Sequence, residues 1–147
     1  MKKITALTLV LILTMLICAC GGPQETAEPD PIVNPVNLTM EIIIGLEDAV
    51  EGGFENVSET PFIAEEGTNL QDATQLFCMA NDLTVTIDSG KGYLTEMVGL
   101  SEKDYTESTG WIFKVNGVIP SVPAQDVIVL ENDKITWEFV DFNTYSW

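Results

Sequence analysis

Apolar and polar residues alternate with a period of two in several short segments after residue 37, as they do in half-buried strands. In the segment 134–140, Ile135, Trp137 and Phe139 fall on one face. The other segments with an extended pattern are 39–44, 61–64, 83–88, 93–98, 110–115 and 127–130. We therefore expect a domain made mostly of short strands, with Trp137 in its core.

The period changes near residue 69, where the pattern predicts the main helix. Four apolar residues at i, i+3, i+7 and i+10 form one stripe, namely Leu70, Ala73, Phe77 and Ala80. Thr68 and Gln71 have the spacing of a capping box, so we predict a helix over 69–80. The acidic, glycine-bearing segment 47–59 predicts a loop. One helix against several strands indicates a small α+β fold in which the sheet dominates.

Turn signals separate the predicted strands. Asn116-Gly117 predicts a tight hairpin turn, because both residues tolerate positive φ. Val118-Ile119 returns from this turn, and Pro120 ends the return. The residues 89–92, with two glycines and a serine, predict a second turn.

The first 19 residues have the features of a secretory signal peptide. Lys2 and Lys3 precede an apolar run over 4–17, which is shorter than the roughly 20 residues that a membrane-spanning helix needs. The run ends in Ala19-Cys20, which resembles a bacterial lipobox and implies lipidation of the Cys20 thiol. A plain signal peptide with an incidental cysteine pair is the alternative. We expect a chain anchored through Cys20 to the extracytoplasmic face of the cell membrane.

The residues 20–37 predict a flexible, acidic, proline-rich tether. They contain four prolines and almost no apolar residues, so they cannot bury a core. The folded domain is expected from 38 to 147. Within it Cys78 would be the only cysteine, so no disulfide can form there. Because Cys78 lies in the apolar stretch 76–80, we expect a small buried core residue rather than a reactive thiol.

Composition limits the partners of the chain. The net charge is −17, and removal of Lys2 and Lys3 with the signal would leave four lysines against 23 carboxylates, or −19. Nucleic acid is excluded as a partner, since phosphates need a basic surface. An anionic lipid surface would also repel the domain, so the lipid on Cys20 has to hold it. The charge suits solubility at a cell surface; an acidic recognition surface is the alternative.

The residues that are missing exclude most catalytic systems. The sequence has no His, so it has neither a Ser-His-Asp nor a Cys-His system, and zinc loses its commonest ligand. No phosphate-binding glycine motif and no calcium loop motif is found, although a weak surface calcium site stays open at this charge. Carboxylates could support hydrolysis, but their abundance makes that pattern uninformative. We expect a protein that is not an enzyme and has no cofactor.

A spaced pattern in the second half of the chain resembles a known family. Its residues are Gly110-Trp111-Ile112-Phe113-Lys114-Val115-Asn116-Gly117, Pro120-Ser121-Val122, Ala124, Val127, Leu130, Asp133 and Ile135-Thr136-Trp137, with Gly67-Thr68, Leu70 and Asp72-Ala73 before them. The pattern resembles the transcobalamin-like C-terminal domain, a domain of unknown function in many bacterial surface proteins. The resemblance covers about residues 40–142 and implies a small β-grasp-like domain.

The resemblance also implies a ligand. In transcobalamin and intrinsic factor, the similar domain closes over one face of cobalamin. The residues that it assigns to ligand contact are Tyr93, Leu94, Trp111, Asn116, Gly117, Val118, Ile119, Pro120, Ser121, Val122 and Pro123. For Trp111, core packing beside Phe113 and Val115 is the alternative. This chain lacks the large helical domain that supplies much of the pocket in those vertebrate proteins.

Two function classes follow from these observations. The first is a surface lipoprotein that binds a ligand without enzymatic activity; cobalamin or another corrinoid is the expected ligand, and a membrane importer is a candidate partner. The second is a cell-surface adhesion or protein-interaction module without a small-molecule ligand. Titration of the mature domain with cyanocobalamin separates them.

Overall fold

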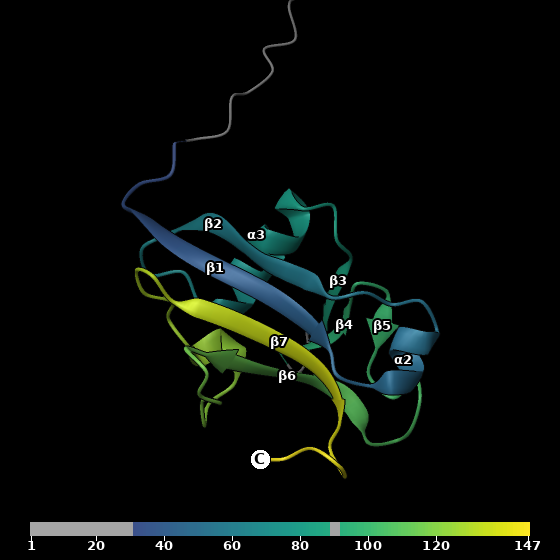
Figure 1. The fold of residues 1–147 in the computed structure, drawn as a ribbon. Coiled ribbons are helices and arrows are strands. Elements are labelled where there is room, and N and C mark those ends of the chain that lie inside the picture. Colours follow the sequence, from purple (N-terminus) through teal and green to yellow (C-terminus); the bar gives the residue numbers. More distant parts are fainter. Residues whose placement is uncertain (1–30, 89–91) are drawn as a thin grey trace, which may run out of the picture. The chain divides into compact units, whose positions relative to one another are not determined.

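Four strands form the main sheet, in the order β2-β1-β7-β6 (Figure 1). The structure is a computed structural model that describes residues 31–88 and 92–147. The four strands are β1 (Pro35–Ile44), β2 (Val57–Glu65), β6 (Thr109–Val115) and β7 (Lys134–Asp141). The central strands β1 and β7 are parallel, while β2 and β6 run antiparallel to their neighbours. This mixed sheet confirms the predicted α+β, β-grasp-like fold.

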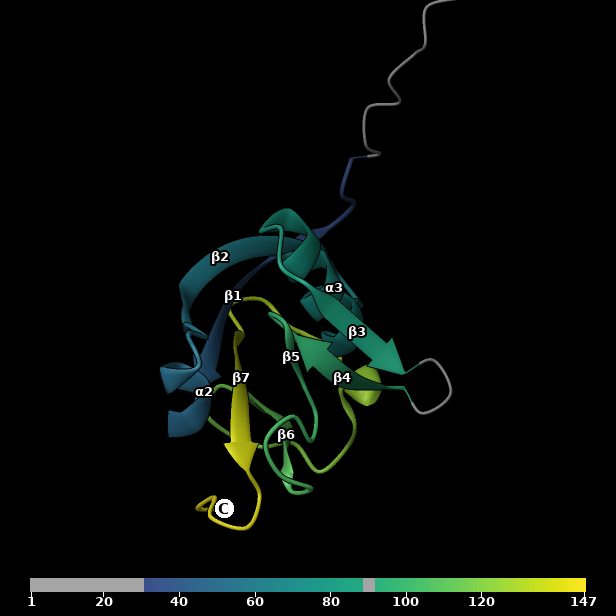
Figure 2. The ribbon, with the colours of Figure 1, turned by 90° about the vertical axis from the view of Figure 1, so that its right-hand side faces the viewer.

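One face of the main sheet is covered by the helix α3 (Leu70–Ala80) and by a second sheet, as Figures 1 and 2 show from two sides. The second sheet consists of β3 (Val85–Asp88), β4 (Tyr93–Met97) and β5 (Leu100–Ser101). The strand pattern predicted extended segments here but did not indicate that they form a sheet of their own. Of the predicted turn at 89–92, residues 89–91 lie outside the described ranges.

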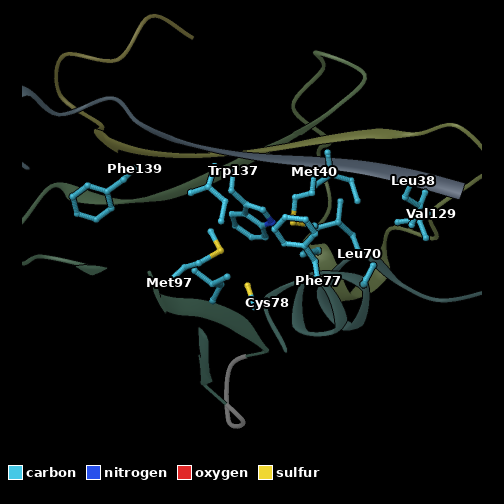
Figure 3. Packing of buried hydrophobic residues seen from close by; sticks show 14 of the residues in the cluster. Leu38, Met40, Leu70, Phe77, Cys78, Met97, Val129, Trp137 and Phe139 are labelled. Carbon is cyan, nitrogen blue, oxygen red and sulfur yellow. The ribbon is translucent and has the colours of Figure 1, made fainter. Parts of the chain in front are cut away.

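The core lies between the main sheet and these covering elements (Figure 3). Met40 of β1 and Trp137 of β7 face Phe77 of α3, and Met97 of β4 approaches from the second sheet. The indole Nε1 of Trp137 donates a hydrogen bond to Thr74 Oγ1 at 3.0 Å, so its polar atom is satisfied inside the core. The prediction that Trp137 is a core residue is confirmed.

The predicted helix is confirmed, but its cap and its stripe differ from the prediction. Asn69 caps α3 by accepting a hydrogen bond from the backbone N–H of Asp72 at 2.9 Å, in place of Thr68 and Gln71. The backbone carbonyl of Thr68 accepts a hydrogen bond from Val129 N at 3.0 Å. Ala80 is exposed, and Thr74 and Cys78 complete the buried stripe.

The segment 47–59, predicted as a loop, contains a short helix, α2 (Glu47–Glu51), and its end already belongs to β2, which begins at Val57. Ala49 is fully buried, and the N–H of Val50 donates to the carbonyl of Leu46 at 3.2 Å. Burial of one small residue thus stabilises a helical turn that the acidic composition did not suggest. Of the helices in the described ranges, none combines the length and apolar character needed to cross a membrane.

The first strand begins earlier than predicted. β1 starts at Pro35, inside the segment 20–37 that was expected to be tether, and Val36 is buried. The backbone N–H of Asn37 donates to Glu131 Oε2 at 2.7 Å, which fixes this end of the strand to the turn before β7. Proline is tolerated at the first residue of a strand because it needs to donate no ladder hydrogen bond there. The predicted signal peptide, Cys20 and the tether up to residue 30 lie outside the described residues.

Phe139→Ala should destabilise the domain strongly. Phe139 is fully buried, and its ring centroid lies 5.1 Å from that of Trp111 and 6.3 Å from that of Tyr105. We expect a loss of about 3–5 kcal/mol in the free energy of unfolding, measured by urea titration with tryptophan fluorescence. The matched control is Phe142→Ala, an exposed position where about 1 kcal/mol or less is expected. Equal losses in the two variants would contradict this description of the core.

Candidate ligand-binding site

The hairpin turn after β6 has the geometry that its sequence predicts. Asn116 and Gly117 have φ values of 52° and 79°, as a turn of type I′ requires. Val115 and Val118 exchange two backbone hydrogen bonds, of 2.9 and 3.0 Å. Val118 forms an isolated bridge with Val115 and no strand follows it directly in the described chain, so the predicted return of Val118-Ile119 is limited to that one bridge.

The loop that follows this turn exposes apolar side chains. The exposed fractions are 67% for Val118, 38% for Ile119 and 44% for Val122. Ser121 and Pro123 are also exposed, and Pro120 is half-buried. The loop then turns inward through the 3-10 helix η1 (Ala124–Asp126), whose Ala124 is buried. Aliphatic side chains on a proline-stiffened loop with both ends fixed can contact a ligand at a low entropic cost.

Two further exposed apolar residues were not among the predicted contacts. Ile128 and Leu130 are 51% and 64% exposed, while Val129 between them is buried. The segment bridges to the start of α3, where Leu70 N donates to Val127 O at 2.8 Å and Val129 N to Thr68 O at 3.0 Å. All four residues of 127–130 are apolar, so the sequence pattern could not show that buried and exposed side chains alternate in this segment. We call Val118, Ile119, Val122, Ile128 and Leu130 the apolar rim.

Asp133 connects the two segments that carry the apolar rim. Its Oδ1 accepts from Asn116 Nδ2 at 2.7 Å, and its Oδ2 accepts from the backbone N–H of Leu130 at 2.8 Å. Asn116 Oδ1 in turn accepts from Lys134 N at 2.9 Å. Both polar atoms of the Asn116 side chain therefore form hydrogen bonds within the protein. In the structure this predicted contact residue connects the hairpin turn to the turn before β7.

Trp111 packs in the domain. Its Nε1 donates to Leu100 O at 3.0 Å, and its ring lies against that of Phe139. The indole thereby links β6 to β5 of the second sheet. Core packing, the alternative that the sequence left open for Trp111, agrees with these contacts.

The two predicted contacts on β4, Tyr93 and Leu94, both have partners within the domain. Leu94 is buried in the core, so its side chain serves packing. Tyr93 is half-buried, and its hydroxyl donates to Glu102 Oε1 at 3.3 Å. Neither residue is exposed in the way that the residues of the apolar rim are.

A shallow hollow of about 360 Å³ lies over the outer side of β1 and β2. It is lined by Asn37, Leu38, Thr39, Glu59, Pro61, Asn132 and Lys134. None of the residues predicted to contact a ligand lines it. The Lys134 ammonium group in the hollow is already paired with Glu59 at 2.7 Å and with Glu41 at 3.1 Å. An anion would have to compete with both carboxylates for this lysine.

Each described lysine is paired with a carboxylate. Lys114 lies 2.7 Å from Glu138, and Lys103 lies 3.6 Å from Glu107. The hydrogen bond from Lys134 to Glu59 raises the pKa of Lys134 and lowers that of Glu59, while Glu138 raises the pKa of Lys114. These three ammonium groups are therefore engaged within the protein, and none of them belongs to the apolar rim.

The described residues offer no evident metal centre. No group of three or more His, Cys, Asp or Glu side chains within the described ranges could hold a metal ion. Cys78, the only described cysteine, is buried, and this burial raises its pKa to about 11. The expectation of a small core cysteine is thereby supported, and a nucleophilic role would require a thiolate that the core disfavours.

Comparison with known families and structures gives two informative matches. The profile of the family described as Domain of unknown function (DUF4430) matches residues 67–141, which is about half of the chain. No curated protein matches the chain. The crystal structure of haptocorrin in complex with Cbi is similar in fold, with a TM-score of 0.59 and 16% sequence identity.

The similarity to haptocorrin covers 76% of this chain and 26% of the haptocorrin chain, so this chain spans about a quarter of that protein's length. At this identity the match establishes the fold, and it confirms the resemblance predicted from the motif. A protein of Ruminococcus gnavus, provisionally described as metal binding, matches with a TM-score of 0.47 and 13% identity over 72% of this chain and 97% of its own.

Cys78 should resist thiol reagents in the folded protein. In a chain carrying Cys18→Ser and Cys20→Ser, the rise in pKa from 9.0 to about 11 lowers the thiolate fraction at pH 8 about a hundredfold, so labelling by Ellman's reagent should be slow until urea is added. Because the unfolded thiol ionises first, stability should fall as pH rises from 9 towards 11. The variant Cys78→Ala should lose this part of the pH dependence. Rapid labelling of the native protein would contradict a buried thiol.

Proposed function

This chain belongs to the DUF4430 family, and we propose that it is a membrane-anchored, non-enzymatic ligand-binding module whose apolar rim binds a corrinoid. The observation that carries the proposal is the exposure of Val118, Ile119 and Val122 on the loop that the family resemblance assigned to ligand contact. The fold shared with haptocorrin, which was crystallised in complex with Cbi, supports the choice of ligand class.

The chemistry of a corrin ring suits this rim. The ring is a wide, partly apolar disc with amide side arms at its edge. Aliphatic side chains can cover the disc, while the hydroxyl of Ser121 and exposed backbone groups of the loop can bond to the amide arms. Binding of this kind requires no charged residue, which agrees with the pairing of the described lysines elsewhere.

The cobalt of such a ligand would keep its own axial groups. The sequence contains no His, and the thiol of Cys78 is buried, so neither usual strong ligand is offered at the rim. Contact would therefore be made with one face and the edge of the ring. No step of bond making or bond breaking follows from this arrangement, which supports a binding role.

Affinity should be weak for this domain by itself. Burying three partly exposed aliphatic side chains contributes about 4–6 kcal/mol in total, which corresponds to a dissociation constant on the order of 0.05–1 mM. One face of a disc remains in water when a single rim covers the other face. The attachment of the chain to a membrane would raise the local concentration near a second ligand-binding protein, such as an importer, and so compensate for the low affinity.

Titration with cyanocobalamin tests the proposal. We expect saturable binding by calorimetry or absorbance up to about 2 mM ligand, and a loss of about tenfold in affinity for the double variant V118S/V122S. The matched control is I63S/L76S, which changes side chains of similar exposure, 49% and 46%, on β2 and α3. Absence of binding by the folded protein, or equal losses in both double variants, would overturn corrinoid binding at the rim. Adhesion or protein interaction would then be the function to examine.

The lipid anchor is proposed from the sequence and has its own test. Expressed in a bacterium that processes lipoproteins, the wild-type chain should partition into the detergent phase of a Triton X-114 extraction. Cys20→Ser should move it to the aqueous phase or leave the signal uncleaved, because the thiol that accepts the lipid is gone. Cys18→Ser is the matched control and should behave as wild type. Detergent partitioning of Cys20→Ser after signal removal would rule out this anchor.

A further inference from the structure

The hairpin turn after β6 and the turn before β7 are joined by a closed set of hydrogen bonds around Asp133 and Asn116. Asp133 accepts from Asn116 Nδ2 at 2.7 Å and from Leu130 N at 2.8 Å. Asn116 accepts from Lys134 N at 2.9 Å through Oδ1, and its own N–H donates to Lys134 O at 2.8 Å. Every donor in this set has a specific acceptor, so the two turns can meet in one geometry only.

This set of hydrogen bonds joins the two segments that carry the residues of the apolar rim. Asn116 is two residues before Val118, and the Leu130 amide that Asp133 holds belongs to a residue of the apolar rim. In the described chain, the two segments that carry the rim have no regular strand pairing with each other. The pairing of β6 with β7 and the backbone bond from Asn116 N to Lys134 O bring the two turns together, and side-chain bonds then fix the rim segments to each other. Asp133, whose exposed fraction is 9%, provides two of these bonds to donors from different segments.

We propose that Asp133 and Asn116 form a positioning pair that aligns the two halves of the apolar rim, so that ligand affinity depends on their mutual hydrogen bond. The inference rests on the proposed binding function for its effect on affinity, while its effect on the turns can be measured without any ligand.

The chemistry of the pair allows a test by exchange of the two residues. In D133N, the new side chain has one acceptor oxygen instead of two, so either Asn116 or Leu130 loses its bond. In N116D, two carboxylates face each other at hydrogen-bond distance and repel. In the double variant N116D/D133N, the amide now at position 133 would donate to the carboxylate now at position 116 and accept from Leu130 N. That carboxylate would still accept from Lys134 N, so all bonds of the set are restored with the polarity of one reversed.

The measurement is amide hydrogen exchange by mass spectrometry on the full chain in detergent micelles, for peptides spanning 127–136. We expect exchange at the Leu130 amide, the Lys134 amide or both to be roughly tenfold faster in each single variant, and exchange at both to be within about twofold of wild type in the double variant. Affinity for cyanocobalamin should fall and recover in parallel, while the urea midpoint changes little in comparison with Phe139→Ala. Asn56→Asp is the control for the added charge, because Asn56 uses its side-chain oxygen as an acceptor from Ile44 N, a role that a carboxylate keeps.

The outcomes separate the two proposals. Exchange that is unchanged in the single variants, or that stays fast in the double variant, overturns the positioning pair whatever the ligand result. Rescue of exchange without any cyanocobalamin binding by the wild type supports the pair and overturns corrinoid binding. Intact mass of each preparation should be checked, since an Asn-Gly step is prone to spontaneous deamidation at Asn116.

Discussion

The parallel pairing of β1 with β7 is the constraint on which the rest of the structure depends. Parallel neighbours cannot be joined by a tight turn, so the chain between Ile44 and Lys134 has to cross one face of the sheet. That crossing contains α3 and the second sheet, which cover the apolar side of β1 and β7. The bond from Trp137 Nε1 to Thr74 Oγ1 links the central strand to the helix and satisfies the polar atom that the core encloses.

The apolar rim is a consequence of how the end of this crossing is held. The loop after β6 is fixed at the Val115–Val118 bridge, and its far end bonds to residues 68–70 at the start of α3. Ala124 and Val129 are directed into the core, which leaves their neighbours Ile128 and Leu130 outside. The start of α3 therefore organises both the core and the candidate ligand surface. A surface that is held in this way meets its ligand with little further ordering.

The described positive charges are neutralised within the protein and lie outside the apolar rim. The chain has a net charge of −17, and its described lysines are each paired with carboxylates, two of them on strands of the main sheet. Strong net charge keeps a protein soluble even where its surface carries exposed apolar residues such as those of the rim. Repulsion between copies also disfavours self-association through the exposed rim, which leaves it free for a neutral, disc-shaped ligand of the kind that we propose.

The sequence by itself determined most of the strands, the main helix, the Asn116-Gly117 turn and the family resemblance, because periodicity and turn chemistry act over neighbouring residues. Only the tertiary structure decided which apolar residues are covered. Leu94 and Leu130 are both leucines in extended segments, yet Leu94 is buried by the core and Leu130 is exposed. Alternation assigns residues to two faces, but it cannot say which face another element will cover. The role of Asp133 was equally hidden, since its partners Asn116 and Leu130 become its neighbours only when the two turns are brought together by the pairing of β6 with β7.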